Sequence, residues 1–172
     1  MKNWFYEQMA MYSAYHRDGR NQATHHVGVP MIVFSVLVIT STMPLVSTAQ
    51  GPVTVGAALM ALLVLFYIIA APLVGTIAAL LYGALSYGAA QIAAIGEGVP
   101  MKVFLTLFIV GWIIQFWGHK FEGRKPALFD NLLQIFMAPS FLIAEILFSL
   151  GLEEGLHAEI KSRMGKYLPK KG

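Results

Sequence analysis

Four of the five histidines of this chain lie at the two edges of one long apolar block. In chain order they are His16, His25, His26 and His119. Inside the block only Glu97 and Lys102 carry a formal charge. Polar side chains at the rim of a membrane protein are costly to keep there, so their presence indicates chemistry. Because imidazole is the commonest metal ligand, a metal site is the first hypothesis.

The first polar cluster surrounds His16 and His25. Nine residues separate them, about two and a half helical turns, so one continuous helix would point the two rings in opposite directions. We expect Asp18-Gly19 to break the helix, which lets both imidazoles converge. Asn21 lies four residues before His25 and would share its helix face.

The second polar cluster lies at the end of the apolar block. Gln115, His119 and Glu122 occupy positions i, i+4 and i+7 and therefore form one polar stripe on an otherwise apolar helix. The basic pair Arg124-Lys125 follows this stripe.

Neutral imidazoles together with a carboxylate suit a first-row transition metal. Two histidines and one carboxylate with open positions are typical of non-haem Fe(II) oxygenases. Three histidines are typical of catalytic zinc. Without a metal, the same histidine and glutamine side chains would cap helix ends and bond lipid headgroups. The spacing alone leaves these three interpretations open.

A third polar group follows, consisting of Asp130, Asn131, Gln134 and Glu145. Glu145 is the least expected of them because it lies inside an apolar run. A buried carboxylate needs a partner, either a metal-bound histidine or a basic side chain. His26 is expected to point away from its neighbour His25, and His157 to be a solvated residue of the polar tail.

The composition limits the classes of protein. Of the 172 residues 57% are hydrophobic and 12% are charged, about half the charged fraction of an average soluble protein. Without cysteine, any metal must be held by histidine, carboxylate or amide groups. The basic residues flank apolar runs, which favours an anionic lipid surface and not nucleic acid as the partner. We find no nucleotide-binding or hydrolase motif, and expect no cleavable signal peptide.

Four apolar runs of 18 to 23 residues are predicted to cross a membrane. They are residues 27–46, 53–71, 73–95 and 101–118, with turns at 47–52, Pro72 and 96–100. Each is long enough for a hydrocarbon core of about 30 Å. Because four crossings return the chain to its starting side, the histidines before and after them share one face.

The distribution of basic residues gives the orientation. Only Lys102 lies near the other face, and ten basic residues lie on the histidine side. These ten are Arg17, Arg20, Lys120, Arg124, Lys125, Lys161, Arg163, Lys166, Lys170 and Lys171. The positive-inside rule then places the histidines and both termini in the cytoplasm, in a bacterial inner membrane or the endoplasmic reticulum.

A fifth apolar run, residues 132–150, is interpreted as a re-entrant or interfacial segment. A full crossing, the alternative, would place the basic tail outside. Residues 4–16 predict an amphipathic helix at the interface. We therefore predict an all-α integral membrane bundle of one domain. Its parts are an interfacial segment (1–26), four transmembrane helices (27–118), the re-entrant or fifth span (129–150) and a basic cytoplasmic tail (151–172).

Two motifs resemble a known family. The first motif comprises Tyr12, His16, Asn21, His25, Gly28 and Pro30. The second comprises Gln115, Gly118, His119, Phe121, Glu122, Arg124, Pro126, Ala127 and Leu128, followed by Asp130, Asn131 and Leu132. With the order and hydropathy of the chain from about Tyr12 to Leu150, they resemble the membrane-bound 2-hydroxy fatty acid dioxygenases of fatty-acid α-oxidation. The tail after Leu152 is not similar.

The resemblance implies an Fe(II)-dependent enzyme that uses O2 to cleave a long-chain 2-hydroxy fatty acid between C1 and C2. The product would be a fatty acid one carbon shorter. Such an acid can chelate iron through its hydroxyl and carboxylate, while its acyl chain lies among the spans and membrane lipid. The implied metal ligands are His16, His25 and His119.

Further roles follow from the same resemblance and from side-chain chemistry. Glu122 is expected as a fourth ligand or a partner of the ligands, with Asn21 and Gln115 as further catalytic candidates. The candidates for binding the substrate are Arg124, Lys125, Arg20 and Tyr12.

Two other functions compete with this one. A di-metal lipid hydroxylase or desaturase needs more histidines than the five present. A non-catalytic membrane scaffold or lipid-binding protein would hold no metal. Metal analysis separates the three classes, whereas the sequence sets neither the preferred chain length nor the oligomeric state.

Overall fold

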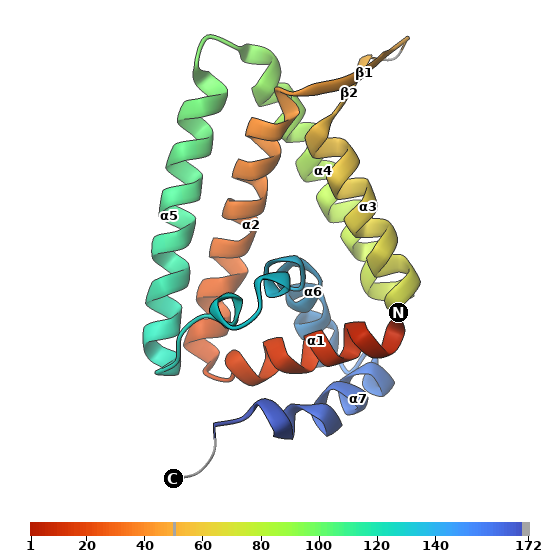
Figure 1. The fold of residues 1–172 in the computed structure, drawn as a ribbon, viewed down its shortest axis with the longest axis vertical. Helices are drawn as coiled ribbons and strands as arrows, with labels where there is room; N and C mark the ends of the chain where they lie inside the picture. Colours follow the sequence, from red (N-terminus) through yellow and green to blue (C-terminus); the bar gives the residue numbers. More distant parts are fainter. Residues whose placement is uncertain (50, 170–172) are drawn as a thin grey trace.

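The computed structural model describes residues 1–49 and 51–169, which are mostly helical. Four long helices run in alternating directions. They are α2 (Gly19–Ser41), α3 (Val55–Ala70), α4 (Pro72–Ile95) and α5 (Val99–Glu122). Helix α2 packs along α5, and α3 packs along α4. In Figure 1 these pairs form two legs that approach each other at one end and diverge at the other.

The helix boundaries follow from local sequence. The first helix, α1 (Lys2–Tyr15), ends before Asp18, whose side chain accepts a hydrogen bond from the Arg20 backbone N–H at 2.9 Å and caps α2. The predicted break at Asp18-Gly19 is therefore confirmed. Pro72 begins α4, where its missing N–H costs nothing. Gly123 ends α5 with a φ of 65°, a conformation that favours glycine.

Glycines allow α2 and α5 to come close together. A Cβ atom on Gly28 would lie 3.0 Å from the carbonyl oxygen of Gly111. A Cβ atom on Gly118 would lie 2.0 Å from the hydroxyl oxygen of Thr24. Because small residues let helix backbones approach closely, this contact sets the distance between the polar ends of α2 and α5.

Three helices are long and apolar enough to cross a membrane: α2, α4 and α5. This agrees with the prediction of a helical membrane protein. Helix α3 has 16 residues, which at 1.5 Å per residue gives about 24 Å, less than a hydrocarbon core. The predicted count of four crossings therefore stays a prediction.

The first predicted span differs from the structure at both ends. Helix α2 begins at Gly19 and ends at Ser41, whereas the prediction was 27–46. Strands β1 (Pro44–Thr48) and β2 (Gly51–Thr54) follow as an antiparallel hairpin, in which Val46 pairs with Val53. Pro44 disfavours helical backbone at the residue before it, and the valines and threonines that follow favour extended backbone. The prediction that the first span continues to residue 46 was therefore wrong, whereas the fold is mostly helical, as predicted.

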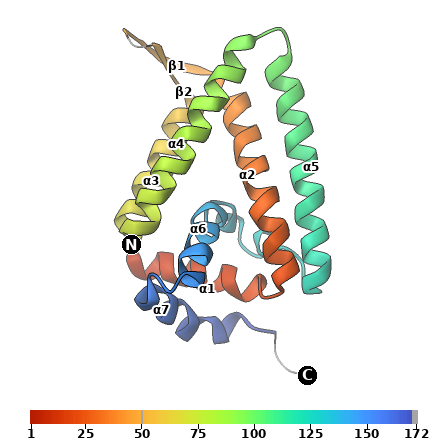
Figure 2. The same cartoon turned by 180° about the vertical axis from the view of Figure 1, so that it is seen from behind.

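The remaining elements gather at the end that carries the histidines. Helix α1 crosses this end beneath the two legs, and α7 (Glu154–Met164) lies against α1 (Figures 1 and 2). Phe5 and Met9 of α1 are buried together with Tyr67 of α3 and Phe141. The buried core therefore connects α1 to the α3–α4 leg and to α6.

The fifth apolar run is divided into short pieces. After η1 (Ala127–Phe129) come the 3₁₀ turn η2 (Leu132–Phe136) and α6 (Ala138–Ser149). Helix α6 has 12 residues, about 18 Å at 1.5 Å per residue, too short for a crossing by itself. The tail continues into α7 and η3 (Gly165–Tyr167) and docks on α1, where Lys166 Nζ lies 2.6 Å from a Glu7 carboxylate oxygen.

Candidate metal centre

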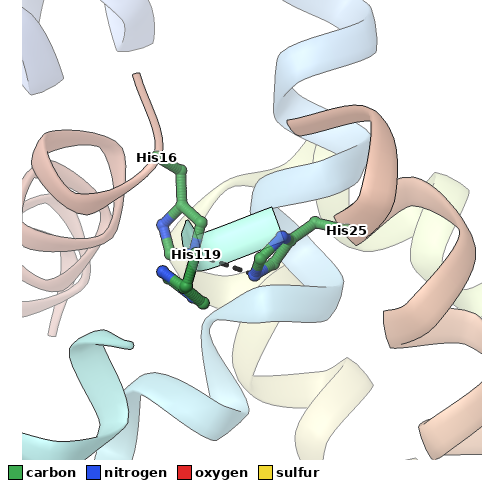
Figure 3. Close-up of side chains that lie close together, drawn as sticks. All are labelled: His16, His25 and His119. Atoms are coloured by element: carbon green, nitrogen blue, oxygen red, sulfur yellow. Dashed lines mark hydrogen bonds between the residues drawn. The ribbon is translucent and has the colours of Figure 1, made fainter. Parts of the chain in front are cut away.

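Three buried histidines from different segments meet at the end of the molecule where α1 lies. His16 is in the turn between α1 and α2, His25 in the second turn of α2, and His119 in the last turn of α5. One ring nitrogen from each histidine lies within 4.8 Å of those of the other two (Figure 3). Each residue is at most 6% exposed. The structure thus brings together the three histidines that the sequence analysis selected.

Hydrogen bonds fix the tautomers of His16 and His25. Nδ1 of His16 lies 2.7 Å from the Tyr12 carbonyl oxygen, and Nδ1 of His25 lies 2.8 Å from the Asn21 carbonyl oxygen. A carbonyl only accepts, so each Nδ1 carries the hydrogen and each neutral ring has its lone pair on Nε2. Yet the two Nε2 atoms lie 3.0 Å apart. Two lone pairs at this distance need a cation between or beside them.

A metal ion fits this requirement better than a proton does. Burial, and then the neighbouring His25 ring, lowers the pKa of His16 well below its usual range, which disfavours a protonated ring. Metal-bound histidines normally donate their other N–H to a carbonyl or carboxylate, as His16 and His25 do here. The buried Nδ1 of His119 has no partner among the described residues. An imidazole site suits iron, zinc, copper or nickel.

Glu122 joins two segments of the site. Its Oε2 accepts hydrogen bonds from the backbone N–H groups of Arg17 at 3.0 Å and Asp18 at 2.8 Å. It also accepts one from Asn21 Nδ2 at 3.1 Å. These hydrogen bonds connect the end of α5 to the start of α2. Of the two roles expected for Glu122, these contacts favour a partner that positions the histidines.

A cavity of about 90 Å³ opens beside the histidines. Tyr12, His16, Gln115 and His119 line it together with apolar side chains. The Tyr12 ring stacks on the His16 ring at 4.0 Å between centroids. The buried Oε1 of Gln115 has no hydrogen-bond partner within the described part of the chain. The cavity therefore has two candidate metal ligands, His16 and His119, on its wall and a glutamine with an unpaired acceptor.

Gln134 is a further lining residue that the sequence analysis grouped but gave no role. It is 1% exposed, and its Nε2 donates to Gln8 Oε1 at 2.7 Å. Its Oε1 is buried and unpaired among the residues described. The signal in the sequence was a glutamine inside an apolar run. The 3₁₀ turn η2 that directs it toward the histidines was not predictable from that signal.

The three basic residues expected to hold the substrate carboxylate all have other partners. Arg20 pairs with Asp18 at 2.8 Å, and Lys125 pairs with Asp130 at 2.5 Å. Arg124 donates to the Tyr167 carbonyl oxygen at 2.9 Å. None of the three is a lining residue of the cavity. Their proposed role stays a prediction, whereas Tyr12 does line the cavity.

The other two histidines lie outside the histidine group. His26 Nε2 lies 3.2 Å from a carboxylate oxygen of Glu145, an ion-pair distance. Of the two partners considered for Glu145, the structure thus supplies the basic side chain. The His157 ring stacks on Phe148 at 4.3 Å between centroids. Neither histidine belongs to the candidate metal group found in the described residues.

Comparisons with known proteins add an independent line of evidence. The sequence model of one family, described as "2-hydroxy-palmitic acid dioxygenase Mpo1-like", matches residues 2–150. The chain is 34% identical over 158 residues to 2-hydroxy-palmitic acid dioxygenase MPO1 of Saccharomyces cerevisiae. That alignment covers 90% of this chain and 86% of the yeast protein. No solved structure matches the chain.

Proposed function

The chain belongs to the Mpo1-like family, and from that premise we propose that it is a membrane-embedded, Fe(II)-dependent 2-hydroxy fatty acid dioxygenase. The yeast relative's name supplies the substrate class. The structural observation that carries the proposal is the pair of Nε2 lone pairs, 3.0 Å apart, beside His119. His16, His25 and His119 would hold the metal.

The proposed reaction consumes one O2 and breaks the C1–C2 bond of the substrate. For atoms to balance, C2 becomes the carboxyl carbon of the shortened fatty acid, and C1 leaves as CO2 with one water. When bound, the iron would supply O2 binding and a Lewis-acidic site for a chelating 2-hydroxy acid.

The protein side chains would bind and orient the substrate. Gln115 and Gln134 line the cavity, and each has a buried Oε1 atom that is unpaired among the residues described, so each side chain is a candidate acceptor for the 2-hydroxyl group. Tyr12 stacks on His16 and holds that ring in place. The apolar remainder of the wall excludes water from the reacting groups.

The proposed location of this site is the edge of a membrane. The length and composition of helices α2, α4 and α5, which are sufficient to span one, support it. The bias of basic residues toward the histidine end supports a cytoplasmic location for that end. The membrane would be a bacterial inner membrane or the endoplasmic reticulum. A substrate dissolved in the bilayer reaches the histidines without leaving the lipid.

The test uses full-length protein purified in detergent and loaded with Fe(II). It is incubated under air with a long-chain 2-hydroxy acid and, separately, with the unsubstituted parent acid. We expect O2 consumption and a product one carbon shorter from the 2-hydroxy acid alone. Equal conversion of both acids, or a product of unchanged length, contradicts the proposal. Two metals per chain would indicate a di-metal enzyme, stoichiometric zinc a zinc enzyme, and no metal a scaffold.

A further inference from the structure

A second, larger cavity lies between α2 and α3, with η2 and the start of α1 on its other sides. Its volume is about 550 Å³. Val36, Leu63 and Phe66 are among the residues that line it, together with Trp4 from α1. None of its lining residues is a metal-ligand candidate, so this cavity has no assigned role in the proposed function.

The two cavities share part of their walls. Ile32 and Val33 of α2 and Ile135 of η2 line both the histidine cavity and the larger cavity. Along α2 the walls extend from Val29 beside the histidines to Thr40 near the other end of the helix. Eleven residues at 1.5 Å each give a length of about 16 Å.

The apolar wall of the larger cavity favours an uncharged hydrocarbon ligand. No charged side chain lines the larger cavity. Its one hydroxyl, on Thr40, already donates to the Val36 carbonyl oxygen at 2.6 Å. The wall therefore offers no charged partner to a phospholipid headgroup, and its remaining side-chain polar hydrogen is the indole N–H of Trp4. A fatty acid whose polar end lies at the histidines leaves only its hydrocarbon tail for this cavity.

We propose that the larger cavity holds the acyl chain of the 2-hydroxy fatty acid, an inference that rests on the proposed function. The carboxylate and 2-hydroxyl lie at the histidine cavity. The tail passes between Ile32, Val33 and Ile135 and continues between α2 and α3. Affinity then grows roughly fourfold per buried methylene until the cavity is full. Chain-length preference is set here and not at the metal.

Fluorescence quenching tests this placement without requiring turnover. The chain has three tryptophans. Trp4 lines the larger cavity, Trp112 lines the histidine cavity, and Trp117, 62% exposed, lines neither. Variants retaining one tryptophan, with phenylalanine at the other two positions, are titrated in detergent with two long-chain 2-hydroxy acids. One acid carries bromine near the chain end, and the other carries it near C2.

Bromine near the chain end should quench Trp4 more strongly than Trp112, and bromine near C2 should give the reverse. Trp117 is the control for acid dissolved in the detergent. Equal quenching of all three tryptophans by both acids overturns the proposal. So does a tail-brominated phospholipid that quenches Trp4 and is not displaced by the fatty acid, because a membrane lipid would then be the occupant.

Enzyme kinetics give a second test. Leu63→Trp fills the middle of the larger cavity, whereas Leu65→Trp changes an exposed side chain on the same helix that lines neither cavity. Leu63→Trp should lower kcat/KM for a long-chain acid at least tenfold more than for a short-chain acid. Leu65→Trp should leave the ratio unchanged. If Leu63→Trp does not fold, Leu63→Phe replaces it.

A ratio unchanged in the folded Leu63 variant contradicts the placement of the chain. No turnover of any 2-hydroxy acid by the wild-type protein contradicts the proposed function instead. The quenching result still decides whether the cavity binds the chain, so the two failures are distinguishable.

Discussion

The two helix pairs of the bundle, α2–α5 and α3–α4, pack closely in the same way, but only one of them carries the candidate metal site. In both pairs, glycine lets the backbones come close: Gly118 in the α2–α5 pair and Gly75 in the α3–α4 pair, where a Cβ atom would lie 2.2 Å from the Ile68 backbone nitrogen. The pairs differ in the polar groups that they bury. This difference distinguishes the α3–α4 pair, which supports the fold, from the α2–α5 pair, which carries the candidate site.

In the α3–α4 pair the buried polar groups have partners. Tyr67 donates its hydroxyl hydrogen to the Phe136 carbonyl oxygen, and Tyr82 donates to the Pro139 carbonyl oxygen at 3.3 Å. No buried side-chain nitrogen or oxygen is unpaired in the described residues of these two helices. These hydrogen bonds connect the α3–α4 pair to η2 and α6. They leave no unpaired polar atom in the described part of this pair that a ligand would have to bond.

In the α2–α5 pair the opposite holds. Asn21 Oδ1, Gln115 Oε1 and His119 Nδ1 are buried without partners among the described residues. An unpaired buried polar atom costs about 1–3 kcal/mol. These atoms belong to the helix pair that also carries His25 and His119, and a ligand can supply the partners that they lack. The comparison predicts that changes in one pair alter the metal site and equivalent changes in the other pair do not.

The largest effect is expected from the histidines themselves. His119→Ala removes one of the three proposed ligands, so metal content and activity should each fall on the order of a hundredfold or more, beyond the loss typical of outer-shell changes. Metal analysis of the purified variant and O2 uptake measure this. His157→Ala, which alters a ring stacked on Phe148, is the control and should keep both. Full metal occupancy in His119→Ala would refute the ligand assignment.

Glycine substitutions compare the two pairs directly. Gly118→Ala places a Cβ atom 2.0 Å from Thr24 Oγ1, and Gly75→Ala places one 2.2 Å from the Ile68 backbone. Each should destabilise the protein by about 1–3 kcal/mol, because a well-packed contact must open. Only Gly118→Ala should also weaken metal binding, since it moves α5 relative to α2.

Thermal unfolding and metal titration measure these two effects. Gly83→Ala is the control, because a Cβ atom there meets nothing within 4 Å. If Gly75→Ala weakens metal binding as much as Gly118→Ala does, the two pairs are not independent.

A smaller effect is expected from removing single polar contacts. Glu122→Gln keeps the size of the side chain but removes its charge, which weakens the bonds from Arg17 and Asp18. Metal affinity should fall roughly tenfold, as for other groups that orient ligands. Tyr82→Phe removes one hydrogen bond in the other pair and should cost about 1 kcal/mol of stability with no change in metal affinity. Isothermal titration with the metal separates the two outcomes.

These comparisons also show what the sequence could and could not predict. The break at Asp18-Gly19 followed from helical periodicity. The convergence of His16, His25 and His119 was expected from that break, from the parity of the apolar runs and from the family motifs. The hairpin after Ser41 did not follow from the sequence, because the apolar run was extended to residue 46 and the β-branched residues of 44–54 suit a strand as well as a helix or a turn. Arg20 and Lys125 pair with nearby carboxylates, Asp18 and Asp130, which the sequence analysis did not consider as competitors for the substrate. The contact between Arg124 and Tyr167 joins residues 43 positions apart, which spacing does not encode.

The smallest expected effect concerns the contact between the tail and α1. Hydrogen bonds from Lys166 and then Tyr167, opposed by slight burial, lower the pKa of Glu7 below its usual 4.5. A carboxyl group with a depressed folded-state pKa stabilises the fold above its unfolded pKa, and this contribution is lost as the pH falls through the folded value. The contribution of Glu7 to stability should therefore be constant from pH 7 to about 4.5 and decline below it. The contribution is small, because the pair with Lys166 is largely exposed and solvent screens it.

Glu7→Gln should remove this part of the acid dependence while leaving metal affinity at pH 7 unchanged, since Glu7 lies outside the histidine group. Thermal melting of both proteins between pH 7 and pH 3 measures it, and identical pH profiles would show that the tail does not dock through Glu7.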